Sequence, residues 1–143
     1  MKPQLLLAAL LLFASPALAE DVVLLKCDVL TSLVTKQVGK NQVLEKKQIE
    51  EQAFLKVDTA NSRVKINAGR WENVTIANGV VFSTTNVEEG GATIVGEFML
   101  EFSPPGRLGI QGTTILGDAL QEMSVKGACQ LADEAAFGKA LSQ

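Results

Sequence analysis

Apolar and polar residues alternate along most of the chain after residue 21. In residues 22–35, Leu25, Cys27 and Val29 fall on one face of an extended chain, and this face is expected to point inward. A second alternation sets Ile94, Gly96, Phe98, Leu100 and Phe102 against Val95, Glu97, Met99 and Glu101. A period of two predicts β-strands, each with one buried face and one solvated face.

Turn-forming residues divide this pattern into short segments. Turns are predicted at residues 59–62, 68–70, 78–79, 88–91 and 104–106, and the Asn78-Gly79 pair is the strongest hairpin signal among them. The remaining strands are expected at residues 54–58, 63–67, 74–77, 80–85, 107–116 and 120–129. This spacing predicts an all-β fold, an antiparallel meander that forms a small sandwich or an incomplete barrel.

Two segments do not follow the alternation. Residues 38–52 favour a helix by propensity but carry no apolar stripe, so the pattern allows either a short polar helix or a polar edge strand. Residues 133–141 are rich in alanine and are expected to form a short C-terminal helix or a frayed tail. The fold is therefore predicted to be β-rich with a small helical contribution.

The first nineteen residues have the pattern of a signal peptide. Lys2 precedes an apolar run, and Ala17-Leu18-Ala19 is a small-x-small cleavage site before Glu20. The run is shorter than the roughly twenty residues that span a bilayer. We expect cleavage between Ala19 and Glu20, a single β-rich domain at residues 20–143, and a periplasmic or secreted location.

Two cysteines, Cys27 and Cys129, remain in the expected mature chain. In an oxidising compartment they are expected to form one disulfide that joins the first strand to the last. Two reduced structural thiols or a redox pair are the alternatives, although no Cys-x-x-Cys spacing favours the redox pair.

Composition narrows the possible functions. The formal net charge is −3 with no basic run, which argues against binding to nucleic acid. The chain contains no His, so Ser-His-Asp triads, Cys-His dyads and histidine metal sites are excluded. Glu97 and Glu101 lie about 13 Å apart along a strand, too far for a glycosidase pair, and are interpreted as a solvated face. No catalytic residue, metal ligand or cofactor is assigned.

Arg70, Trp71 and Arg107 are candidate partner contacts. Trp and Arg are over-represented at binding hot spots, and Arg70-Trp71 lies beside a predicted loop. A core or rim position is the alternative for Trp71. Gly69-Arg70-Trp71 also resembles the Gly-x-Trp motif of lipocalins, but it lies in the middle of the chain, whereas the lipocalin motif opens the first strand.

The layout of the chain resembles other small exported proteins. The pattern of Cys27, residues 54–58, residues 71–74 and residues 127–129 resembles small exported bacterial β-rich proteins with no assigned role. Its size and single predicted disulfide resemble the periplasmic lysozyme inhibitors, which are small barrels. Their inhibitory loop has a Ser-Gly-x-x-Tyr pattern, whereas this chain has no Tyr and no Ser-Gly pair. The resemblance implies a layout and no activity.

These features predict a non-catalytic exported protein that binds another protein or an envelope component through its loops. The alternative is a carrier of a small apolar ligand, because 47% of the chain is hydrophobic. A hydrolase of unknown type is the third possibility. The pattern predicts no stable membrane span and leaves the oligomeric state open.

Overall fold

The computed structural model describes residues 22–141, so the predicted signal peptide at residues 1–19 lies outside the described residues. Nine strands and one helix form from the described residues. In chain order they are β1 (Val22–Gln37), β2 (Val43–Asp58), β3 (Arg63–Ile66), β4 (Trp71–Asn73), β5 (Thr75–Ala77), β6 (Val80–Glu89), β7 (Ala92–Phe102), β8 (Pro105–Leu116), β9 (Ala119–Leu131) and α2 (Glu134–Leu141).

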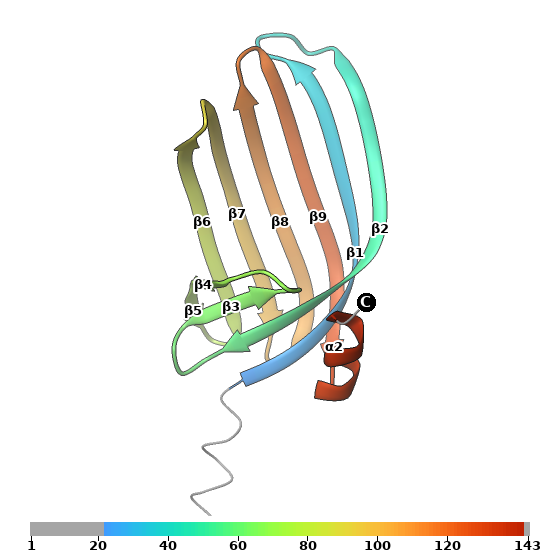
Figure 1. The fold of residues 1–143 in the computed structure, drawn as a ribbon, viewed down its shortest axis with the longest axis vertical. Coiled ribbons are helices and arrows are strands. Elements are labelled where there is room, and N and C mark those ends of the chain that lie inside the picture. Colours follow the sequence, from blue (N-terminus) through green and yellow to red (C-terminus); the bar gives the residue numbers. More distant parts are fainter. Residues whose placement is uncertain (1–21, 142–143) are drawn as a thin grey trace, which may run out of the picture.

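All nine strands belong to one sheet, in the order β4-β3-β2-β1-β9-β8-β7-β6-β5. The pairing is antiparallel throughout, and the one pair that is distant in sequence is β1 with β9. β4 and β5 end the order on opposite sides, yet only Val74 separates them along the chain. The sheet therefore curves round and nearly closes (Figure 1), which confirms the predicted all-β incomplete barrel.

The short strands β3, β4 and β5 complete the barrel at one end, which we call the closed end. β3 pairs with the final residues of β2, and β5 pairs with residues 80–82 of β6. The hydrophobic core fills this end, and its buried side chains are Leu25, Cys27, Val29, Ala53, Leu55, Val57, Val64, Val81, Leu100, Phe102, Leu108 and Val125. The inward faces predicted from the alternation in β1 and β7 are thus confirmed.

The long strands continue past the closed end as a sheet of six strands, which we call the open end. Its order is β2-β1-β9-β8-β7-β6, and no strand lies beyond β2 or β6 there. Residues 43–52 of β2 pair with β1 only, and residues 83–89 of β6 pair with β7 only. Figure 1 shows the long strands rising above β3, β4 and β5, with β6 and β2 as the two outer strands.

A disulfide joins Cys27 of β1 to Cys129 of β9, as predicted. The two residues are cross-strand partners, and their Cα atoms lie 4.0 Å apart. They are 102 residues apart in sequence, so the bond constrains the unfolded chain by about 4.7 kcal/mol in the chain-entropy description. The bond fixes the one pairing of the sheet that is distant in sequence.

The C-terminal segment forms the helix α2, which packs on the outer side of β2. The Phe137 ring is buried and contacts Phe54 edge-on, with the ring centroids 5.5 Å apart. The ammonium of Lys56 lies 5.0 Å from the centroid of Phe137. The helical alternative for residues 133–141 is therefore correct. Across residues 22–141, no helix is long and apolar enough to span a membrane.

The structure decides one open alternative and corrects several predicted boundaries. Of the two alternatives for residues 38–52, the polar edge strand is correct from residue 43 onward, because β1 supplies backbone partners to residues 43–52. β4 was not predicted, since three residues are too few to show a period. β6 continues through Glu89, so the turn predicted at 88–91 is confined to Gly90-Gly91, both at positive φ. β8 begins at Pro105, which is a position where a strand tolerates proline.

Candidate functional site

The inner face of the open end continues the core beyond the closed end. Five strands, β1, β9, β8, β7 and β6, contribute three successive cross-strand rows to it. The rows are Thr31, Val125, Ile110, Phe98 and Ser83; Leu33, Met123, Gly112, Gly96 and Thr85; and Thr35, Gln121, Thr114, Ile94 and Val87. We call these fifteen positions the open inner face, and none of them carries a charge.

The opposite side of the same strands has a different character. The rows interleaved with the open inner face carry Glu97, Glu122 and Lys126, and Lys36 lies further along β1. Lys36 Nζ donates a hydrogen bond to Glu122 Oε1 at 3.2 Å, and the two side chains form an ion pair. Over these three rows charge is therefore confined to the outer side of the five strands, and the next inward-facing row ends in Glu89 at the tip of β6.

Exposure increases along the open inner face away from the core. Val125 is buried, and Phe98 and Ile110 are half-buried against the core. Met123 and Val87 are 36% and 44% exposed. Met123 and Val87 thus present apolar side chains to solvent, beside the polar Thr35, Gln121 and Thr114 of the outermost row.

Two glycines form the middle of this surface. Gly96 and Gly112 are cross-strand partners, so the centre of the second row has no side chains. A Cβ added at Gly96 would lie 3.1 Å from the Gln111 carbonyl oxygen. The residues round them enclose a shallow hollow of about 200 Å³ that includes Ile94, Phe98, Ile110 and Met123. Pockets for drug-sized ligands measure about 300 to 1,000 Å³, so the smaller hollow suits a narrow chain and not a bulky molecule.

Charged residues border this surface on β2. The inner face of residues 43–52 carries Glu45, Lys47 and Glu51 round the exposed side chain of Ile49. All four are solvent-accessible. An apolar chain on the open inner face would thus have polar groups within reach at the β2 edge, where a polar head group can stay in water.

A second hollow lies on the outer face. It measures about 400 Å³, and its lining includes Phe82, Met99, Gly109 and Glu97. Phe82 and Met99 are 46% and 37% exposed, and Gly109 lies beside Met99 on the next strand. This hollow is larger than the inner one, and Glu97 belongs to the lining of both, so the two hollows differ in volume and in the side of the sheet on which they lie.

Trp71, one of the predicted contacts, lies at the rim of the closed end. Its ring is half-buried and stacks under the Arg63 guanidinium, with Cζ 4.3 Å from the ring centroid. Arg63 Nε in turn donates to Asp58 Oδ2 at 2.8 Å. Arg70 is exposed just before β4. Trp71 is therefore part of the local structure of the β2–β3–β4 ribbon.

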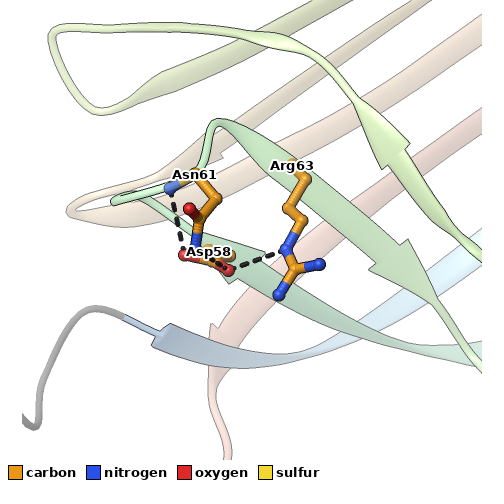
Figure 2. A network of polar contacts seen from close by, with 3 residues as sticks. All are labelled: Asp58, Asn61 and Arg63. Atoms are coloured by element: carbon orange, nitrogen blue, oxygen red, sulfur yellow. Dashed lines mark hydrogen bonds and ion pairs between the residues drawn. The ribbon is translucent and has the colours of Figure 1, made fainter.

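Asp58 is the centre of this polar network, drawn in Figure 2. It accepts hydrogen bonds from the backbone N–H of Asn61 at 3.2 Å and from its Nδ2 at 2.9 Å, in addition to the Arg63 bond. The hydrogen bond from the Asn61 side chain, followed by that from Arg63, lowers the pKa of Asp58. These three hydrogen bonds all lie within the turn between β2 and β3, so the network stabilises the turn.

Arg107, the third predicted contact, lies at the start of β8. Its backbone N–H and its Nε both donate to Glu101 Oε1, at 3.0 and 3.1 Å. These bonds, the backbone one foremost, lower the pKa of Glu101. Within residues 22–141 no hydrogen bond, ion pair or ring contact joins Arg107 to Arg70 or Trp71. The loop surface of these three residues remains a prediction.

The sequence did not identify the open inner face. Its residues were recognised only in part, as the inward alternation of β7 and the shared parity of Met123, Val125 and Cys129. The absence of charge from this face can be recognised only when the cross-strand register of all five strands is known. In the described part of the chain, no group of three or more His, Cys, Asp and Glu side chains could hold a metal ion.

Comparisons with known proteins gave no match, whether with protein-family models, with curated proteins or with solved structures.

Proposed function

We propose that this protein is an exported, non-catalytic carrier that binds one apolar chain, such as a fatty acyl chain, along the open inner face. The observation that carries the proposal is the set of fifteen uncharged positions that continue the core into solvent. This apolar-carrier function was the alternative to loop binding at the level of sequence. Export is supported by the disulfide and by the signal-peptide pattern at residues 1–19.

The energetics favour a chain over a compact ligand. Each methylene removed from water contributes about 0.8 kcal/mol, so a chain lying across several strands gains from each row it covers. The hollow round Gly96 and Gly112 admits a narrow ligand between flanking side chains. Because the face is open on one side, binding is expected to be reversible, as transfer between membranes or proteins requires.

Two methionines provide a matched test of this proposal. Met123 lies on the open inner face and is 36% exposed, and Met99 lies on the outer face and is 37% exposed. Met123→Glu introduces a carboxylate where the chain would lie, so it should weaken binding of a fluorescent fatty acid at least about tenfold. Met99→Glu should bind as the wild type does.

The readout is fluorescence titration of delipidated protein, with circular dichroism as a check that both variants fold. Loss of binding in Met99→Glu alone would place the ligand in the outer hollow and overturn the proposed site. Wild-type protein that takes up no fatty acid at all would overturn the carrier function itself.

A further inference from the structure

The two free edges of the open end differ in their protection against pairing. An exposed strand edge is a template for another strand unless charges, proline or a bulge block it. The β2 edge, residues 43–52, carries Glu45, Lys46, Lys47, Glu50 and Glu51. Five charges in ten residues protect this edge against pairing.

The β6 edge has no such protection over most of its length. Residues 83–87 read Ser-Thr-Thr-Asn-Val, with no charge and no proline, and Thr and Val favour strands. Their register with β7 runs without a bulge from Val80 to Glu89. All of these side chains except the half-buried Ser83 are exposed. The edge is therefore regular, accessible and suited to accept a further strand.

We propose that the occupant of this edge is a second copy of the same chain, paired β6 to β6 in antiparallel orientation. β5 already pairs with residues 80–82, and Gly90 begins the turn to β7, so residues 83–89 are the segment free to pair. The middle residue of this segment is Asn86. A two-fold axis at Asn86 uses the whole free edge of both copies.

The pairing that follows from this axis is favourable on chemical grounds. Asn86 faces Asn86 of the second copy, and Thr85 faces Val87. Glu88 and Glu89 oppose Thr84 and Ser83, so no like charges meet directly. In each opposed pair the two residue numbers are both odd or both even, so inward-facing residues of one copy meet inward-facing residues of the other. The open inner faces of the two copies therefore join on the same side of one continuous sheet.

The protected β2 edge explains why the assembly would stop at two copies. At the open end, a two-fold contact between β6 edges leaves only the β2 edges exposed, and their charges discourage further growth. Pairing of β6 with β2 would instead generate an open-ended fibre. The asymmetry between the two edges of one sheet thus specifies a closed dimer.

A cysteine placed on the axis tests the contact directly. Opposed Cα atoms in an antiparallel pair lie about 4.5 to 5.5 Å apart, within the range that a disulfide spans. Asn86→Cys should therefore form a covalent dimer under mild oxidation, whereas Gln48→Cys on the β2 edge should stay monomeric. Peptide mapping verifies that Cys27 and Cys129 remain joined in both variants.

Charge exchange at the same position provides an independent measurement. In sedimentation equilibrium the wild type should show a reversible monomer–dimer equilibrium. In Asn86→Lys and in Asn86→Glu the affinity of dimerisation should be at least about tenfold lower, because like charges meet on the axis. An equimolar mixture of the two should recover dimers. Gln48→Lys is the control and should dimerise as the wild type does.

A wild type that stays monomeric at every concentration overturns the proposal, as does a dimer that both Asn86 substitutions leave unchanged. A concentration-dependent ladder beyond the dimer also overturns it, because it indicates open-ended pairing. These outcomes do not depend on fatty-acid binding, which is measured separately.

Discussion

Asp58 is a buried acidic residue that is held by hydrogen bonds in the turn between β2 and β3. It is 4% exposed and accepts hydrogen bonds from Asn61 and Arg63, so its carboxylate form is stabilised and its pKa is lowered from 3.8. A lowered folded pKa contributes stability that is fully present above the ordinary pKa and is lost as the pH falls through the folded value. The turn between β2 and β3 is therefore expected to be sensitive to acid.

Asp58→Asn removes this titration, and urea unfolding at pH values from 7 down to 2 measures the effect. The wild type should lose stability below about pH 4, and the variant should start less stable at neutral pH but lose less on acidification. The pKa of Glu101 is also lowered, and Glu101 remains in the variant. Part of the dependence of stability on pH should therefore persist. Glu97→Gln, an exposed change on the outer face, should keep the wild-type slope. Equal slopes for the wild type and Asp58→Asn would contradict this reasoning.

Among the elements, the turn between β5 and β6 links two hairpins at the closed end. Asn78 and Gly79 both have positive φ, as the Asn-Gly signal predicted. The Gly79 carbonyl oxygen accepts hydrogen bonds from the N–H groups of Phe102 and Ser103, at 2.9 and 3.3 Å. The turn therefore holds the end of β7 as well as its own hairpin.

Gly79→Ala should destabilise the protein by about 1 to 3 kcal/mol, because φ is +78° and the new Cβ would overlap the Ser103 carbonyl oxygen. Gly90→Ala is the matched control, since its φ is +61° but no atom lies within 4 Å of the added Cβ. Gly90→Ala should introduce backbone strain without a steric overlap, so its free energy of unfolding should fall by less than that of Gly79→Ala. Urea denaturation ranks the two variants, and an equal loss would show that the contact with Ser103 contributes nothing.

A strand can be predicted from the sequence when one of its faces is buried, because apolar and polar residues then alternate along it. In β7 the alternation of Phe98 and Leu100 with Glu97 and Met99 follows the two faces of the strand, so the strand and its inward face were predictable. Residues 43–52 of β2 are exposed on both faces, so no period distinguishes strand from helix. The open inner face depends on the pairing of β1 with β9, which joins distant residues and leaves no local signal beyond Cys27 and Cys129.

The whole molecule combines a closed end that contains the core with an open end that presents its edges. The strands β1, β9, β8 and β7 have backbone partners on both sides over most of their length. Residues 43–52 and 83–89 have partners on one side only. The architecture thus places its least protected backbone next to the face that we propose binds the apolar chain.

Hydrogen exchange measured residue by residue should reproduce this division. At low protein concentration, outward-facing amides of residues 43–52 and 83–89 should exchange near the unstructured rate, and amides round Leu25 and Leu100 should exchange only through global unfolding. Raising the concentration should protect residues 83–89 but not 43–52, because only the β6 edge pairs in the proposed dimer. Adding oleate should slow exchange along both edges of the open end, because the proposed chain lies across the strands between them. Protection of 43–52 by concentration alone would show that the charges on β2 do not protect its edge.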